Sequence, residues 1–146
     1  MLKNISPVLS PEMLKLLSEM GHQDKLVLGD ANFPAERYKK HGITVLRADG
    51  IKIPELLEAI LELYPLDTYV EQPVNLMEVP ADQKVETPIW GVYKSIVKKY
   101  DERGAKAVGT IERGRFYEIC NEAYAVIQTG EEAVYANIIL DKGIVG

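Results

Sequence analysis

The sequence MGHQDKLVLGDANFP spans residues 20–34 and contains the strand around which we expect the rest of the chain to fold. Its apolar centre runs from Lys25 to Leu28, with His22 shortly before it and Asp30 shortly after it. Ligands of open α/β sheets bind outside the carboxyl ends of the strands, which is where Asp30 stands. Two interpretations remain open at this point: a ligand site held by one rigid strand, or a helix end followed by a buried strand and a turn.

The composition describes one acidic domain. The chain has 146 residues, of which 47% are hydrophobic and 27% charged, enough for a single sizeable core, so residues 1–146 are predicted to form one domain. The formal net charge is -5, and the basic residues are scattered along the chain. Nucleic acid is therefore not an expected partner.

The cysteine content and the apolar runs indicate the compartment. Cys120 is the only cysteine and has no internal disulfide partner. The first residues contain no apolar run of the kind found in a signal peptide, and no apolar stretch approaches the ~20 residues that a membrane span requires. We expect a cytoplasmic protein without a membrane partner.

Strand and helix patterns alternate along most of the chain. Beyond the first strand, strands are expected over residues 43–46, 74–79, 105–111, 123–128 and 135–140, and helices over residues 11–20, 54–64 and 88–103, with a last helix ending near residue 121. This alternation predicts an α/β fold: a mainly parallel sheet sandwiched by helices in a single three-layer domain. Trp90 falls off the apolar stripe of its helix, so it either covers a second surface, such as a subunit contact or sugar pocket, or is partly buried beside its own helix.

Several kinds of chemistry lack their motifs in this chain. Neither GxGxxG nor GxxxxGK[ST] occurs, and no serine lies in a GxSxG turn. His22, His41 and Cys120 do not have the spacing of a zinc site, so we expect no metal and no cofactor. What remains is His22 with carboxylates, arginines, amides and tyrosines, a set suited to proton transfer on an uncharged, hydroxyl-rich molecule.

Separated segments, in order along the chain, resemble the intracellular sugar mutarotases, the family of L-fucose mutarotase and D-ribose pyranase. The resemblance covers nearly the whole chain and rests on Leu2-Lys3-Asn4-Ile5-Ser6-Pro7, Glu19-Met20-Gly21-His22, Asp30-Ala31-Asn32-Phe33-Pro34, Arg47-Ala48-Asp49-Gly50, Leu66-Asp67-Thr68-Tyr69, Arg113 with Phe116-Tyr117-Glu118, and Tyr135-Ala136-Asn137. Any one of these segments alone is a weak signal, whereas their shared order is specific.

The resemblance implies roles for six residues. His22 matches the catalytic histidine of the family, Asp30 and Arg113 match sugar-binding residues, and Tyr135, Ala136 and Asn137 match the sugar-binding segment near the C-terminus. It also implies an isomerase that interconverts the α and β anomers of a free monosaccharide, with L-fucose as the expected substrate. We expect His22 and Asp30 to form one half of a pocket and Arg113 with the 135–137 segment to form the other.

The resemblance further implies a homo-oligomer, a decameric ring, with sites near the subunit boundaries. Residues 138–140, 144 and 145 give the C-terminus an apolar segment that could be shared between subunits. Two alternatives stay open: a D-ribose pyranase, and a non-catalytic sugar-binding partner of a transport or catabolic system.

Two departures from the fucose branch bear on these expectations. Gln23 stands where that branch often has glycine, which affects the freedom of the loop beside His22. Ala136 replaces a glycine and gives the Tyr-Ala-Asn form of the ribose branch, whereas the segments around Arg47 and Tyr117 favour fucose.

Each site residue also has a purely structural interpretation. Asp30 can cap the following turn, Tyr135 can belong to the core, and Asn137 can satisfy a strand edge. Arg113 can pair with Glu112 or Glu118 on the surface.

Overall fold

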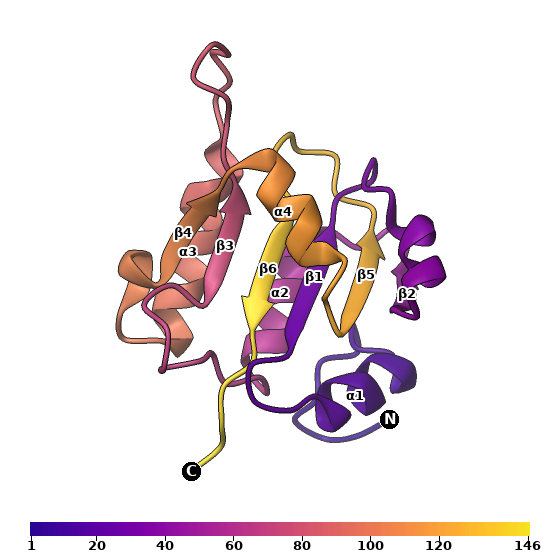
Figure 1. Cartoon of the computed structure of the whole chain (residues 1–146). Coiled ribbons are helices and arrows are strands. Elements are labelled where there is room, and N and C mark those ends of the chain that lie inside the picture. Colours follow the sequence, from indigo (N-terminus) through magenta and orange to yellow (C-terminus); the bar gives the residue numbers. More distant parts are fainter.

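Six strands form one sheet in the order β2-β5-β1-β6-β3-β4, and the computed structural model describes all residues from 1 to 146 (Figure 1). The strands are β1 (Lys25–Gly29), β2 (Thr44–Ala48), β3 (Val74–Met77), β4 (Val108–Ile111), β5 (Ala125–Thr129) and β6 (Ile138–Asp141). The helices are α1 (Pro11–Glu19), α2 (Ile53–Leu61), α3 (Pro88–Tyr100) and α4 (Arg113–Cys120), with 3₁₀ helices η1 (Ala35–His41) and η2 (Gly104–Ala107).

The first predicted strand, β1, lies at the centre of the sheet. It pairs in parallel with β5 and antiparallel with β6, so Leu28 has Ile127 on one side and Ile138 on the other. β6 is the only strand that runs against the others, because it is antiparallel to both β1 and β3. The prediction of a mainly parallel sheet is confirmed. The start of β6 consequently lies at the same edge of the sheet as the end of β1.

The central strands supply side chains alternately to two cores, one on each face of the sheet. In β1, Leu26 and Leu28 join the larger core with α1, α2 and α3, whereas Val27 joins the smaller core with η1 and α4. Ile139 of β6 points to the same side as Val27, while Ile138 and Leu140 join the larger core. Figure 1 shows α4 on the face opposite to α2 and α3. The predicted three-layer sandwich is therefore confirmed.

Side chains cap two of the helices. The Ser10 hydroxyl accepts a hydrogen bond from the Met13 N–H at 3.2 Å, and Pro11 occupies the first turn of α1. The carboxylate of Glu112 accepts hydrogen bonds from the N–H groups of Gly114 and Arg115 at the start of α4. The structure contains no helix with the length and hydropathy of a membrane span.

Two predicted strands begin three residues later than the sequence pattern indicates. Residues 104–107 form η2, which Gly104 opens with a φ of 56°, so β4 begins only at Val108. The last strand begins at Ile138 and not at Tyr135, because Tyr135 has a left-handed backbone with a φ of 52°. Residues 35–41, where the sequence predicts neither a strand nor a helix, form η1.

Gly91 offers a test of helix stability at a site without tertiary constraints. It lies inside α3, and a methyl group there would meet nothing within 4 Å. We expect Gly91→Ala to raise the free energy of unfolding by about 0.5–1 kcal/mol, measured by urea denaturation, because alanine loses less backbone entropy in a helix. Gly42→Ala is the matched control: its surroundings are equally open, but its φ of 75° makes the same change destabilising.

Candidate functional site

Asp30 and Asn137 lie in direct contact at the edge of the sheet where β1 ends and β6 begins. The backbone N–H of Asp30 donates to Oδ1 of Asn137 at 2.7 Å, although the two residues are 107 positions apart. Because a backbone donor requires an oxygen acceptor, this contact orients the amide and leaves its NH₂ group as the remaining pair of donors. The contact also confirms the structural role considered for Asn137, which satisfies a backbone group at a strand edge.

The Asp30 carboxyl group sits in a half-buried turn. Its Oδ1 accepts a hydrogen bond from the Asn32 N–H at 2.9 Å, so Asp30 does cap the following turn. The Gln128 side chain, which is buried at the end of β5, donates to the Asp30 carbonyl at 2.5 Å. Burial raises the pKa of the Asp30 carboxyl group, and the N–H groups of Asn32 and Phe33 oppose this shift only in part. A ligand that donates hydrogen bonds would relieve this incomplete solvation.

The segment Tyr135-Ala136-Asn137 is held from behind by α3. The Trp90 indole N–H donates to the Tyr135 carbonyl at 2.8 Å, and the hydroxyl group of the buried Tyr93 donates to the Ala136 carbonyl at 2.7 Å. The Tyr135 side chain is half-buried, and its hydroxyl group donates to Oε1 of Gln83 at 2.8 Å. These bonds fix a backbone conformation that is uncommon for a tyrosine.

Replacing Tyr93 tests this anchoring directly. We expect Tyr93→Phe to lower the free energy of unfolding by about 1–3 kcal/mol, because the buried Ala136 carbonyl then loses its hydrogen-bond donor. Urea denaturation measures the change. Tyr100→Phe, at the exposed end of α3, is the control and should alter the free energy of unfolding by less than about 0.5 kcal/mol.

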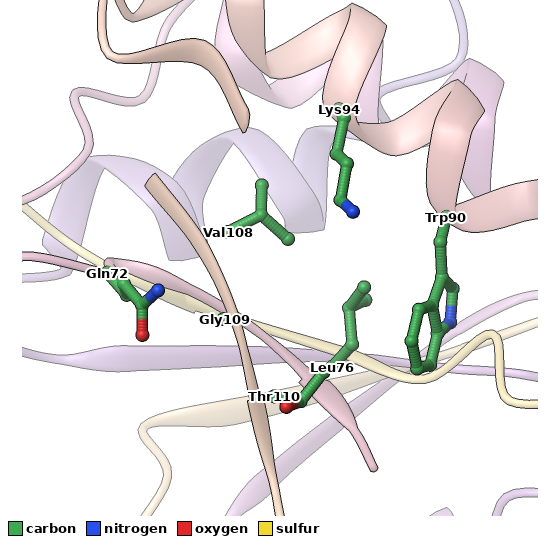
Figure 2. A pocket seen from close by; sticks show the side chains of 7 residues that line it. All are labelled: Gln72, Leu76, Trp90, Lys94, Val108, Gly109 and Thr110. Carbon is green, nitrogen blue, oxygen red and sulfur yellow. The ribbon is translucent and has the colours of Figure 1, made fainter. Parts of the chain in front are cut away.

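The structure confirms one of the two interpretations of Trp90, partial burial beside its own helix. It is half-buried beside α3, and its ring lines a cavity of about 280 Å³ together with Gln72, Leu76, Lys94, Val108, Gly109 and Thr110 (Figure 2). None of the candidate site residues lines this cavity. Trp90 therefore reaches the site through its hydrogen bond to the Tyr135 carbonyl and not through a shared pocket.

Arg113 lies at the start of α4, after the end of β4. Its guanidinium carbon is 6.0 Å from the ring centre of Tyr117, and that ring stacks on Phe33 at 6.0 Å between centroids. Phe33 belongs to the loop that follows Asp30, so an aromatic row joins Arg113 to the Asp30 edge of the sheet. The considered pairing on the surface does not form: Glu112 caps the helix, and Glu118 pairs with Arg115.

His22 lies at the opposite edge of the sheet, in the turn before β1. A strand rises about 3.3 Å per residue, so the five residues of β1 and their flanks separate His22 from Asp30 by roughly 15–25 Å. The Nε2 atom of His22 is 3.0 Å from Oδ1 of Asp67, and its ring centre is 4.7 Å from that of Tyr69. Within one chain, the structure therefore groups Asp30 with Arg113 and the 135–137 segment, and leaves His22 apart from them.

Three further residues, Asp67, Gln128 and Gln83, make contacts for which the sequence predicted no role. Asp67 is almost fully buried: burial alone would raise the pKa of its carboxyl group, but the hydrogen bonds from the Tyr69 N–H and from His22 outweigh burial and hold this pKa below its ordinary value. A polar residue at the end of a buried strand was a usable signal for Gln128. Nothing local indicates the partners of Asp67 and Gln83, which are 45 and 52 residues away in sequence.

No group of three or more His, Cys, Asp or Glu side chains is arranged to hold a metal ion. The chemistry that the arrangement offers is hydrogen bonding and proton transfer. One edge of the sheet carries amide donors, a half-buried carboxylate, a guanidinium group and an aromatic ring face. The other edge carries a histidine paired with a carboxylate. Fold and site together define a three-layer α/β protein suited to an uncharged, hydroxyl-rich ligand.

Comparison with known proteins gives the family. Residues 3–145 match the model of the RbsD / FucU transport protein family, and the chain belongs to this family. It is 49% identical over 146 residues to the fucose mutarotase of Homo sapiens, with 98% of this chain and 94% of the relative covered.

Two solved structures are similar over nearly their whole length. The crystal structure of FucU from Bifidobacterium longum has a TM-score of 0.94 and 52% identity, and the comparison covers 97% of this chain and 99% of that one. The fucose mutarotase of Streptococcus pneumoniae, solved in complex with L-fucose, has a TM-score of 0.91 and 42% identity, with 99% of this chain and 100% of that chain covered.

Proposed function

We propose that this protein is an L-fucose mutarotase, an isomerase that interconverts the α and β anomers of the free sugar. The observation that carries the proposal is the near full-length similarity to fucose mutarotases, including one solved with L-fucose, together with the polar edge formed by Asp30, Arg113 and Asn137. The reaction requires no redox step. One proton leaves the anomeric hydroxyl group and another reaches the ring oxygen, so that the ring opens, the carbonyl group rotates and the ring closes again.

His22 supplies the acid/base group in this proposal. An imidazole can both donate and accept a proton near neutral pH, and a positioned acid/base group contributes about 10²–10⁴-fold to the rate. At the other edge, the carboxylate of Asp30 accepts hydrogen bonds from sugar hydroxyl groups, and the Asn137 amide and the Arg113 guanidinium donate to hydroxyl oxygens. Tyr135 offers a ring face to the apolar side of the sugar, and Ala136 contributes through its backbone.

A single chain holds these two groups of residues too far apart for one sugar. We therefore propose a homo-oligomer, a decameric ring, in which the His22 edge of one protomer meets the Asp30 edge of its neighbour. Head-to-tail contacts of this kind form a ring when the rotation between neighbouring protomers closes after a whole number of subunits. The exposed apolar residues support this arrangement, because Tyr69, Ile144 and Val145 stand near the His22 edge, and Val134 stands beside Tyr135 at the other. Ile138, Ile139 and Leu140, expected to be shared between subunits, are instead buried in the cores of their own chain.

We also propose that the protein works in the cytoplasm. Its single cysteine, Cys120, is a buried free thiol, which fits a reducing compartment. The expected absence of nucleic acid and membrane partners stays a prediction from the charge distribution and the apolar runs of the sequence.

Saturation-transfer NMR on equilibrated L-fucose tests the function. We expect catalytic amounts of the protein to accelerate exchange between the two anomer signals, and to accelerate it less for D-ribose and D-galactose. Sugar binding without faster exchange would exclude the enzyme and leave a sugar-binding protein. Faster exchange with D-ribose than with L-fucose would assign the protein to ribose, in line with the Tyr-Ala-Asn form of residues 135–137.

The raised pKa of the Asp30 carboxyl group predicts how sugar binding depends on pH. Hydrogen bonds from the sugar favour the ionised carboxylate, so affinity should be constant above the pKa of Asp30 and fall as the pH drops through it. Because burial raises this pKa, the loss should begin at a pH above the ordinary aspartate value of 3.8. Titration calorimetry between about pH 4 and 8 measures the affinity. Asp30→Asn should bind more weakly and without this dependence; an unchanged pH profile would contradict the assigned role.

A further inference from the structure

The contact between His22 and Asp67 defines which ring nitrogen carries a proton. The Nε2 atom of His22 is 3.0 Å from Oδ1 of Asp67, whose side chain is 2% exposed. An ionised carboxylate only accepts hydrogen bonds, so Nε2 must be the protonated nitrogen. The neutral imidazole then has its free lone pair on Nδ1, which is not engaged by this contact.

The segment that carries Asp67 is fixed more firmly than an ordinary surface loop. The Asp67 N–H donates to the Asp141 carbonyl at 3.0 Å, and the guanidinium group of Arg103 donates to the Asp67 carbonyl at 2.9 Å. Arg103 is itself held by the Asp101 carboxylate at 2.7 Å. The same Oδ1 that faces His22 also accepts the Tyr69 N–H at 2.9 Å. Hydrogen bonds to both the backbone and the side chain of Asp67 therefore fix the position of the carboxylate that faces His22.

Tyr69 restrains the imidazole from another direction. Its ring lies edge-on to His22, with 4.7 Å between centroids and 81° between planes. The His22 side chain is 28% exposed, so the ring is held while part of it stays accessible. The Asp67 carboxylate is itself buried, so this contact differs from the exposed ion pairs that contribute little to stability, and its restraints fix the oxygen that faces His22.

We propose that Asp67 is a positioning residue that holds His22 in the Nε2–H form, with the help of Tyr69, so that Nδ1 exchanges the proton with the sugar. The catalytic part of this inference rests on the proposed function, whereas the tautomer does not. Nδ1 accepts the proton of the anomeric hydroxyl group, or returns a proton to the sugar, while Nε2 keeps its proton and its bond to Asp67. The imidazolium formed in between is stabilised by the buried carboxylate.

The tautomer can be read by NMR in the absence of sugar. Long-range ¹H–¹⁵N correlation on the labelled full-length protein distinguishes protonated from unprotonated ring nitrogens, and the exposed His41 serves as an internal reference. We expect His22 to be the Nε2–H tautomer at a pH where it is neutral, and to become a mixture in Asp67→Ala. In Asp67→Asn, which keeps an acceptor oxygen, the Nε2–H form should be partly restored.

The kinetics complete the test. We expect Asp67→Ala to lower kcat about 10²-fold with little change in KM, because the base is misplaced while the sugar contacts remain, and Asp67→Asn to recover part of the loss. Asp101→Asn is the matched control for loop support: it weakens the hold of Arg103 on the Asp67 carbonyl but leaves the Oδ1 contact with His22, so the Nε2–H tautomer should persist and kcat should fall far less than in Asp67→Ala.

An unchanged His22 tautomer in Asp67→Ala, or an unchanged kcat, would overturn the proposal. Equal losses in Asp101→Asn and Asp67→Ala would also overturn it, because they would reduce Asp67 to a support of the loop. If the tautomer responds as expected but the wild-type protein does not accelerate anomer exchange, the proposed function fails while the placement of the proton stands.

Discussion

His22→Ala is expected to abolish most of the acceleration of anomer exchange while sugar binding survives. The imidazole is the only side chain in the candidate set suited to both accept and donate a proton near neutrality, so its removal should lower kcat by about 10²–10⁴-fold. The contacts from Asp30, Arg113 and Asn137 remain in the variant. KM and the dissociation constant should therefore change far less than kcat.

Saturation-transfer NMR gives the exchange rate of the variant, and titration calorimetry gives its affinity for L-fucose. His41→Ala is the matched control, since His41 is the only other histidine and lies exposed at the end of η1. It should behave as the wild type does. A His22→Ala variant with nearly full activity would remove His22 from the mechanism and direct attention to a carboxylate or a tyrosine.

The central part of the fold could be predicted because local patterns carry it. The apolar run that ends at Leu28 forms the middle strand, and the alternation of Leu26, Val27 and Leu28 between the two cores follows from the period of a strand. The helices expected from residues 11 and 88 begin where predicted, because a proline stands at each of these positions and favours the first turn of a helix. The antiparallel direction of β6 was not expected, since no local pattern encodes strand direction.

The candidate site was predictable in its residues and not in its arrangement. The resemblance supplied His22, Asp30 and Arg113, but a family motif does not state which end of a strand a residue occupies in space. The distance along β1 follows from strand geometry and separates the two residues that appeared most closely linked. Contacts such as Trp90 to Tyr135 and His22 to Asp67 join distant segments and leave no periodic signal in the sequence.

Gln23 departs from the fucose branch at a position with a left-handed backbone. It directly follows His22 and has a φ of 72°, a conformation in which glycine is the least strained residue. Its N–H donates to the Lys142 carbonyl at 2.8 Å, which anchors the turn despite the strain. The glycine that the fucose branch often has here therefore fits the geometry, and this chain keeps the turn with a hydrogen bond to its C-terminal segment.

Activity restored by mixing two inactive variants is the second large effect that we expect. One variant carries His22→Ala and retains the edge with Asp30; the other carries Asp30→Asn with Arg113→Ala and retains His22. Each homo-oligomer should lose nearly all anomer exchange. If one protomer supplies His22 and its neighbour supplies Asp30 and Arg113, random co-assembly in equal amounts regenerates about one quarter of the sites, because each half is wild type with a probability of about one half.

Co-expression of the two variants with different affinity tags yields mixed oligomers, and saturation-transfer NMR measures their activity per subunit. The control replaces the second variant by a chain that carries all three substitutions, which offers no wild-type His22 and should restore nothing. A site built within one chain predicts no recovery in either mixture, since no protomer is complete. Recovery in the first mixture alone would require a site shared between protomers. It would also explain why β1 holds His22 and Asp30 at opposite edges of the sheet, because each residue would then serve a different neighbour. The strand that separates the two residues within a chain would thus connect consecutive sites around the ring.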